Sequence, residues 1–276
     1  MHPQNPFLKD YNFDILTKSY PPLGDFVLVN DFGTTTIKFA DPKAVKALNT
    51  ALLKAHYGVD WAIPEGYLCP PIPGRLDYLL HIKDLVGRDK LNLLDIGCGA
   101  NLIYPILATC HFNWRCVGSE VHLESLMNAQ EIICSNVSLS TVKLRHQRIK
   151  QNILKDVVWD DDKFDVVVCN PPFYKSRLDA QDKNKRKVKN LALKESESLN
   201  FGGRSNELWY KGGELAFIRK MVEESLLCKN QVDWFTTLVS QKESVKGVKR
   251  AINKAQPSMV KEVSMDLGNK QTRFLA

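Results

Sequence analysis

Four residues that follow a predicted strand, Asn170, Pro171, Pro172 and Phe173, could do chemistry together. The two prolines lack backbone N–H groups and have a fixed φ, so they form a stiff turn. A residue before a proline avoids the α region, and Asn170 is therefore expected to be extended. Its carboxamide supplies an acceptor and donors, and Phe173 supplies a flat apolar face. This stretch suits a planar substrate that carries an NH₂ group.

The reaction that these groups would support is methyl transfer to a conjugated amine. Such an amine is a poor nucleophile, because its lone pair is delocalised. The side-chain oxygen of Asn170 and the carbonyl of Pro171 could each accept one N–H and direct the lone pair at the methyl group. Stacking of Phe173 on the base would contribute about 1–3 kcal/mol. Catalysis would then come from positioning and electrostatics. The alternative is a rigid loop without a chemical role.

A glycine turn is predicted directly after a buried strand over residues 91–96. Gly97 and Gly99 allow the backbone to approach a ligand without a Cβ in the way. The full G-x-G-x-x-G fingerprint is absent because Leu102 occupies its third glycine position, which argues against a pyrophosphate clamp. With Asp95 in front, the turn suits S-adenosyl-L-methionine (SAM). A glycine-rich turn without a ligand is the alternative.

An acid, Glu120, closes the next predicted strand, which covers residues 114–119. A carboxylate at this place, after a glycine turn at the first strand, can accept the hydroxyls of a ribose. The alternative is a solvated acid at a strand end. Together with the turn, Glu120 favours a nucleoside-containing cofactor.

A basic stretch follows Phe173. Residues 175–194 hold eight Lys or Arg and two Asp, a surplus of +6 in a chain whose net charge is +7. We expect a basic loop at the mouth of the site that contacts phosphates, although a solvated disordered loop would have the same composition. The candidate RNA-binding residues are Lys175, Arg177, Lys183, Lys185, Arg186 and Lys187.

The elements that must position these residues alternate between strand and helix. The chain has 276 residues and 44% hydrophobic content, enough for one large domain with a small appendage. Alternation predicts a parallel sheet with helices on both faces and a ligand at the carboxyl ends of its strands. Strands are expected over 91–96, 114–119, 142–146, 164–169 and 234–239, helices over 41–57, 75–86, 102–109, 123–136, 215–227 and 243–254, a hairpin within 26–39, and antiparallel strands over 259–265 and 272–275.

The composition of the chain limits which cell compartment and which partners we expect. No run of 18 apolar residues and no signal-peptide pattern occurs, so we expect no membrane partner. The seven cysteines include no C-x-x-C pair and no Cys/His group with zinc spacing. Buried free thiols in a reducing, cytoplasmic compartment are the best interpretation, with no metal. Nothing in the sequence indicates a dimer, so a monomer is expected.

Four motifs, at residues 68–78, 95–105, 169–173 and 212–217, resemble those of the RlmF-type 23S ribosomal RNA adenine-N6 methyltransferases. A eukaryotic branch of similar enzymes acts on a spliceosomal small nuclear RNA. The resemblance covers nearly the whole chain, although Asn-Pro-Pro-aromatic alone also occurs in DNA adenine and protein-glutamine methyltransferases.

The resemblance implies an α/β class I (Rossmann-like) SAM-dependent methyltransferase fold. It implies a seven-stranded, mostly parallel sheet with an antiparallel last strand in residues 71–276. An N-terminal RNA-binding extension over 1–70 would line a basic groove, and a flexible basic loop would cover about 175–205. The implied product is N6-methyladenine in 23S rRNA, bound naked or in a precursor particle.

The resemblance also implies the site residues. Asn170 to Phe173 would hold the target adenine, Glu120 the ribose and Asn152 the adenine region of the cofactor, and Arg75 would face the cofactor carboxylate. The expected cofactor contacts are Arg75, Asp95, Gly97, Cys98, Gly99, Asn101, Glu120, Asn152 and Asn170. Two alternatives stay open: the same chemistry on another RNA, DNA or protein glutamine, and an RNA-binding relative that has lost catalysis.

Overall fold

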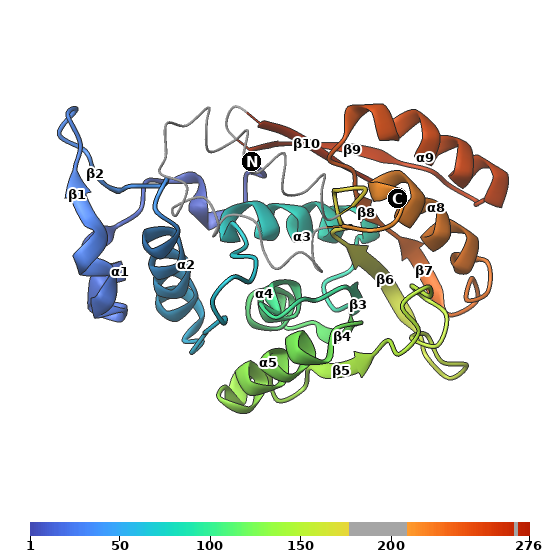
Figure 1. The fold of residues 1–276 in the computed structure, drawn as a ribbon, viewed down its shortest axis with the longest axis horizontal. Coiled ribbons are helices and arrows are strands. Elements are labelled where there is room, and N and C mark those ends of the chain that lie inside the picture. The colour runs from blue at the N-terminus through green and yellow to red at the C-terminus, as the bar shows by residue number, and fades with distance from the viewer. Residues whose placement is uncertain (177–208, 268–269) are drawn as a thin grey trace.

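A five-stranded parallel sheet forms the centre of the molecule (Figure 1). The structure is a computed structural model, and it describes residues 1–176, 209–267 and 270–276. The strand order is β5-β4-β3-β6-β7, with neighbouring strands parallel throughout. The strands are β3 Asn92–Ile96, β4 Arg115–Glu120, β5 Lys143–His146, β6 Phe164–Cys169 and β7 Val232–Phe235.

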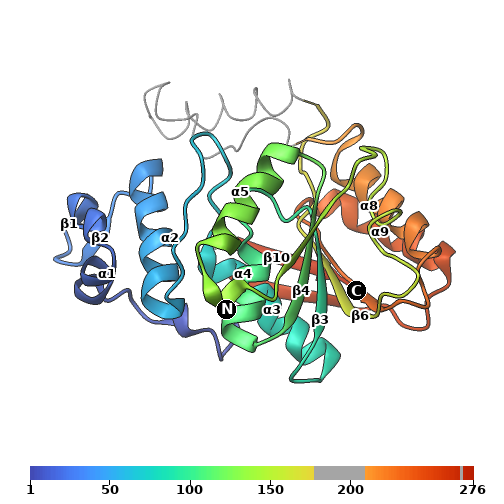
Figure 2. The same cartoon turned by 90° about the horizontal axis from the view of Figure 1, so that it is seen from below.

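The central strands are apolar on both faces, as a parallel sheet between helices requires. In β3 four of five residues are buried, and in β6 five of six. Helices α3, α4 and α5 lie on one side of the sheet and α8 and α9 on the other (Figures 1 and 2). The helices are α3 Ile72–Val86, α4 Ile103–Phe112, α5 Leu123–Cys134, α8 Gly213–Ser225 and α9 Lys242–Ala255.

The predicted single sheet of seven strands is not confirmed. Three short strands, β8 Thr237–Leu238, β9 Glu262–Leu267 and β10 Lys270–Leu275, form a separate antiparallel sheet in the order β8-β10-β9. The strand expected over 234–239 is interrupted at Thr236. Both the N–H and the hydroxyl of Thr236 donate to the carbonyl of Val167, at 2.9 and 2.8 Å. The parallel ladder with β6 ends at Phe235, and from Thr237 the chain pairs with β10 instead, while the antiparallel arrangement expected for the last strands is present.

The N-terminal elements share the core of the sheet domain. Buried Leu52 of helix α2, Leu79 of α3 and Leu93 of β3 belong to one continuous apolar cluster. The expected hairpin and helix are present, and α2 begins at Pro42 after the N-cap Asp41. A division of the chain at residue 70 stays a prediction. The elements are α1 Phe13–Ser19, β1 Val27–Val29, β2 Thr35–Ile37, α2 Pro42–Tyr57 and the 3₁₀ helices η1 Pro6–Leu8, η2 Pro21–Phe26 and η3 Val137–Leu139.

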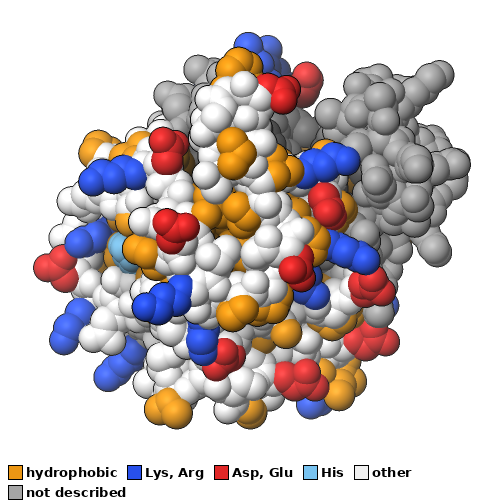
Figure 3. All heavy atoms as spheres, turned by 90° about the vertical axis from the view of Figure 1, so that its left-hand side faces the viewer, with side chains coloured by type: hydrophobic (Ala, Val, Ile, Leu, Met, Phe, Trp, Pro, Cys, Tyr) orange, Lys and Arg blue, Asp and Glu red, His pale blue; other side chains and the backbone are white. Residues whose placement is uncertain are grey.

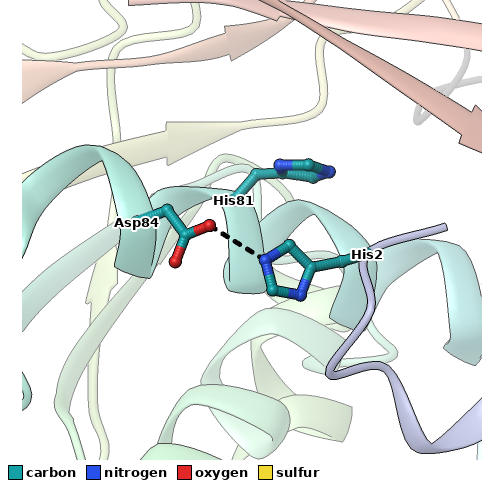
Figure 4. A group of neighbouring side chains, drawn as sticks. All are labelled: His2, His81 and Asp84. Carbon is teal, nitrogen blue, oxygen red and sulfur yellow. Dashed lines mark hydrogen bonds and ion pairs between the residues drawn. The ribbon is translucent and has the colours of Figure 1, made fainter.

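The first residues are tied to helix α3. The His2 side chain points to Asp84, with 2.9 Å between Nε2 and Oδ2 (Figure 4). The backbone N–H of His2 donates to the buried carboxylate of Asp77 at 2.7 Å, and the Asn5 amide donates to the same oxygen at 3.1 Å. Candidate ligand atoms of His2, His81 and Asp84 lie within 4.8 Å of one another, a spacing that a metal ion could use. The His2–Asp84 contact itself accounts for two of these three groups.

The face formed by the N-terminal elements carries charges of both signs. Figure 3 shows lysine, arginine, aspartate and glutamate side chains scattered between apolar ones on this face. The hairpin loop adds Phe32, which is 92% exposed. The basic RNA groove implied for residues 1–70 is therefore not visible as a concentration of positive charge on this face. Among the helices of the described ranges, none has the length and apolar character needed to cross a membrane.

Candidate active site

A cavity of about 610 Å³ opens at the carboxyl ends of β3, β4 and β6. This volume lies in the range of sites for small molecules and cofactors. Ile96, Glu120 and Cys169, the last residues of the three strands, all line it. Eight of the nine expected cofactor residues line the cavity as well: Arg75, Gly97, Cys98, Gly99, Asn101, Glu120, Asn152 and Asn170. Side chains from separate strands and loops therefore meet where sheet topology predicts a ligand.

The glycine turn is held against strand β4. Gly97 and Gly99 have φ values of 73° and 62°, in the left-handed region that glycine adopts without strain. The N–H groups of Gly97 and Cys98 both donate to the carbonyl of Ser119, at 3.0 and 2.9 Å. The turn is therefore fixed by bonds to the neighbouring strand, and its outer side lines the cavity.

Glu120 is fixed by three backbone N–H groups. Its Oε2 accepts from Gly99 at 3.0 Å, and its Oε1 accepts from Val121 and His122 at 2.8 and 2.9 Å. Each carboxylate oxygen has two lone pairs. In this arrangement one lone pair, on Oε2, is left for a donor in the cavity, and the orientation of the carboxylate is set in advance.

Asp95 differs from the other expected cofactor residues because it does not line the cavity. It is 1% exposed, and neither carboxylate oxygen has a hydrogen-bond partner within the described ranges. Burial, reinforced by the nearby charge of Glu120, raises the pKa of Asp95 well above its ordinary value, and Arg75 opposes this shift. A buried carboxyl without hydrogen-bond partners costs free energy, so Asp95 is a destabilising element of this fold when it is charged.

Arg75 comes from the first turns of α3 and lies in the cavity wall. Its guanidinium donates to the hydroxyl of Tyr104 at 3.0 Å. Burial raises the pKa of Tyr104 to about 12, against the opposing charge of Arg75, so this hydroxyl stays protonated near neutral pH. Since a guanidinium has five N–H donors in a rigid fork, Arg75 keeps donors for an anionic ligand group.

The end of β6 supplies the opposite wall. Asn170 and Pro172 line the cavity, whereas Pro171 is buried and Phe173 is partly buried outside the lining. No hydrogen bond joins the Asn170 carboxamide to another residue of the described chain. The carbonyl of Phe173 accepts a bond from the side chain of Gln241 at 2.8 Å. The tip thus presents a free amide to the cavity and is anchored from behind.

Asn152 lies in the loop between β5 and β6. Its side chain donates to Asp156 at 2.7 Å, and it lines the cavity together with Ile153. Gln147 braces the same loop, because its side chain accepts from the N–H of Ile149 at 2.9 Å and donates to the carbonyl of Lys155 at 2.7 Å. These hydrogen bonds fix the loop as one wall of the cavity.

Four aromatic lining residues, Tyr104, Trp209, Tyr210 and Phe217, are not among the site residues expected from the sequence. The rings of Tyr210 and Phe217 meet edge-on with 5.2 Å between centroids. The sequence signal that could have indicated Tyr210 and Phe217 is the Gly-Gly-Glu motif at 212–214, which lies between these two residues.

Among the expected RNA-binding residues, Lys175 is exposed, and Arg177, Lys183, Lys185, Arg186 and Lys187 lie outside the described residues.

The family follows from comparison with known proteins. A family model described as RNA methyltransferase matches residues 1–276. The chain belongs to this family. The ribosomal RNA large subunit methyltransferase F of Pectobacterium atrosepticum is 43% identical over 285 residues, covering 100% of this methyltransferase and 92% of the relative. That of Christiangramia forsetii is 43% identical over 282 residues, covering 100% and 99%. The resemblance found in the motifs is confirmed.

Solved structures confirm the α/β methyltransferase fold. The hMettl16 catalytic domain in complex with the MAT2A 3′UTR hairpin 1 matches with a TM-score of 0.86 and 29% identity, over 100% of this methyltransferase and 94% of that chain. The N-terminal domain of human METTL16 in complex with SAH matches with a TM-score of 0.79 and 25% identity, over 100% and 97%. The neighbours with the same fold thus include one bound to RNA and one bound to SAH.

Proposed function

We propose that this RNA methyltransferase transfers a methyl group from SAM to the N6 amine of a specific adenine in 23S ribosomal RNA. The observation that carries the proposal is the meeting of Glu120, the glycine turn and the free Asn170 amide in one cavity of about 610 Å³. Two relatives with ribosomal RNA large subunit names, each 43% identical over the whole chain, support the substrate.

The lining of the cavity fits this cofactor. When bound, SAM supplies an electrophilic methyl group on a sulfonium. The open lone pair of Glu120 Oε2 suits a ribose hydroxyl, and Arg75 suits the carboxylate of the amino-acid part. Asn152 and the buried Ile153 offer a polar edge and an apolar face for the adenine ring. The SAH (S-adenosylhomocysteine) bound by human METTL16 is the demethylated form of SAM. Its presence in that structure supports SAM as the cofactor here.

At the other wall, Asn170 and Pro171 orient the target amine. The carboxamide oxygen and the Pro171 carbonyl each accept one N–H of the base, so that the nitrogen lone pair faces the methyl group. No general base is required before the methyl group moves, and no metal ion is required. Phe173 stacks on the base in this proposal, which requires its ring to lie toward the cavity when RNA is bound.

The RNA is held outside the cavity. The N-terminal extension over residues 1–70 and the basic residues from Lys175 onward contact its phosphates in the proposed complex, with one protein chain per RNA. A structural neighbour crystallised with an RNA hairpin supports an RNA substrate of this general kind. The substrate is naked 23S rRNA or a precursor particle.

Labelled SAM tests the proposal directly. The protein is incubated with 23S rRNA from a strain lacking the enzyme, intact ribosomes, DNA or release factor, and the labelled product is digested to nucleosides or peptides. We expect N6-methyladenosine in the rRNA alone. Label in DNA or in a glutamine would assign the same chemistry to another substrate. If the chain binds RNA and transfers no label, it is an RNA-binding relative without catalysis.

A further inference from the structure

Helix α8 holds both walls of the cavity through two buried glutamates. Glu214 in its first turn and Glu224 in its last turn are 1% and 3% exposed. A buried carboxylate is costly unless its oxygens accept hydrogen bonds, so the partners of each one define what it stabilises. These partners lie in two different loops, one behind the β6 tip and one in the loop after β5.

Glu214 fixes the anchor of the β6 tip. Its Oε1 accepts from the N–H and the hydroxyl of Ser240, at 2.7 and 2.5 Å, and its Oε2 accepts from the N–H of Gln241 at 3.1 Å. Gln241, which begins helix α9, in turn donates from its side chain to the carbonyl of Phe173 at 2.8 Å. A chain of hydrogen bonds therefore runs from Glu214 through Gln241 to the residue that follows the two prolines.

The two prolines make this anchor effective at Asn170. Their φ angles are fixed, so few torsions separate the carbonyl of Phe173 from the Asn170 side chain. We therefore expect a displacement at Phe173 to move Asn170 as well. A misplacement of about 1 Å in a reacting group can cost on the order of 100-fold in rate.

Two glycines allow the helix to start at this place. Gly212 and Gly213 have φ values of 90° and 74°. A Cβ on Gly213 would lie 2.9 Å from Cγ of Lys175, and a Cβ on Gly212 would lie 2.7 Å from Cβ of Ala216. The Gly-Gly-Glu motif thus brings the start of α8 against the chain that leaves the β6 tip and points Glu214 at its partners.

Glu224 stabilises the cofactor wall by accepting hydrogen bonds from its backbone. Its Oε2 accepts from the backbone N–H groups of Ile153, Leu154 and Lys155, at 2.8, 2.7 and 2.9 Å. Its other oxygen lies 3.4 Å from the ammonium of Lys220. This carboxylate fixes the loop that carries Asn152 and Ile153 into the cavity.

We infer that Gln241, held by Glu214, is a positioning residue for the target amine, and that Glu224 is a positioning residue for the cofactor. The inference rests on the proposed function, because it takes the β6 tip as the target wall. It predicts that loss of the Gln241 bond lowers turnover at saturating SAM with unchanged cofactor affinity. Loss of the Glu224 bonds is expected to weaken cofactor binding and to leave turnover at saturating SAM nearly unchanged.

Gln241→Met tests the first half, because methionine has a similar length and no N–H donor. We expect kcat to fall about 10- to 100-fold, with the affinity for S-adenosylhomocysteine, measured by calorimetry, within twofold of wild type. Hydrogen exchange at the amides of Phe173, Tyr174 and Lys175 should accelerate. Gln241→Asn, whose side chain is one methylene shorter, is a second variant, for which we expect a smaller fall in kcat than for Gln241→Met. Exposed Glu243, two residues further along α9, gives the matched control Glu243→Gln, which should behave as wild type.

Glu224→Gln tests the second half, because it removes the negative charge that three backbone N–H groups and the Lys220 ammonium share. We expect S-adenosylhomocysteine to bind about tenfold more weakly, with kcat at saturating SAM within threefold of wild type. Wild-type turnover in Gln241→Met, or parallel losses of affinity and turnover in both variants, would overturn the inference. If the wild-type protein transfers no methyl group to RNA, the proposed function fails instead, and the exchange rates at 173–175 still report whether Gln241 holds the tip.

Discussion

Two parts of the cavity, the glycine turn and the β6 tip, are stabilised over very different distances in the sequence. Glu120 and Ser119 at the end of β4 bind the glycine turn after the adjacent strand β3, and Glu120 lies 21 residues beyond Gly99. At the target wall, the tip of β6 depends on Gln241, 68 residues further along the chain. A turn held by nearby partners can be recognised from spacing, whereas the β6 tip anchored by Gln241, and the Asn152 loop anchored by Glu224, cannot.

The largest effect that separates the two walls is expected for Asn170→Ala. The variant removes the carboxamide that orients the amine, so methyl transfer should fall at least 100- to 1,000-fold, the usual cost of losing one preorganised polar group at a reacting centre. The affinity for S-adenosylhomocysteine should stay nearly unchanged. Calorimetry and single-turnover assays with saturating SAM measure the two quantities. If cofactor binding collapses instead, the assignment of the two walls is wrong.

Glu120→Gln probes the cofactor wall with the reverse pattern. A glutamine offers one oxygen where the carboxylate accepts three backbone N–H groups, and its NH₂ group meets donors that it cannot pair with. We expect S-adenosylhomocysteine to bind about 10- to 100-fold more weakly, which corresponds to about 1.4–2.8 kcal/mol. Turnover at saturating SAM should fall much less than in Asn170→Ala. Equal losses in the two variants would mean that the walls do not act separately.

The same contrast explains what could be predicted from the sequence. Repeated strand and helix patterns were sufficient for the parallel sheet, and the Asp-x-Gly-x-Gly turn and Glu120 were placed at its carboxyl edge correctly, because both signals are local. The interruption at Thr236 has no local signal, since the strand beyond it pairs with β10, which lies far along the chain. The Gly-Gly-Glu motif is visible in the sequence, yet the partners of Glu214 are distant in sequence, and no local signal indicates what its carboxylate contacts.

Asp95→Asn compares two buried acids near the glycine turn, because Glu120 accepts three hydrogen bonds and Asp95 accepts none from the described residues. Because burial raises the pKa of Asp95 in the folded protein, the folded state binds this proton more tightly than the unfolded chain does. The stabilising contribution is complete at low pH and is lost as pH rises through the folded pKa. Asp95→Asn removes this titration.

Urea unfolding of the wild type and of Asp95→Asn at a series of pH values from 5 to 8.5 measures the difference. We expect the free energy of unfolding of the variant, relative to that of the wild type, to increase with rising pH. The increase should reach on the order of 1–3 kcal/mol at the alkaline end. Glu120→Gln serves as the contrast, since its stability should fall at every pH. A constant difference between wild type and Asp95→Asn would show that the pKa of Asp95 in the folded protein is not raised above the lower end of this range.

The smallest effect is expected for Gly97→Ala, which isolates the backbone of the turn. Gly97 has a φ of 73°, and a Cβ built on it would meet no atom within 4 Å, so the substitution creates no steric overlap with other residues. The cost is the left-handed conformation alone, about 1 kcal/mol of the free energy of unfolding. Urea unfolding measures this loss, and Gly87→Ala, at a left-handed helix end with equally open space, is the matched control away from the cavity. A similar loss of stability in both variants, together with weaker S-adenosylhomocysteine binding in Gly97→Ala alone, would show that the turn is shaped for a ligand as well as for the chain reversal.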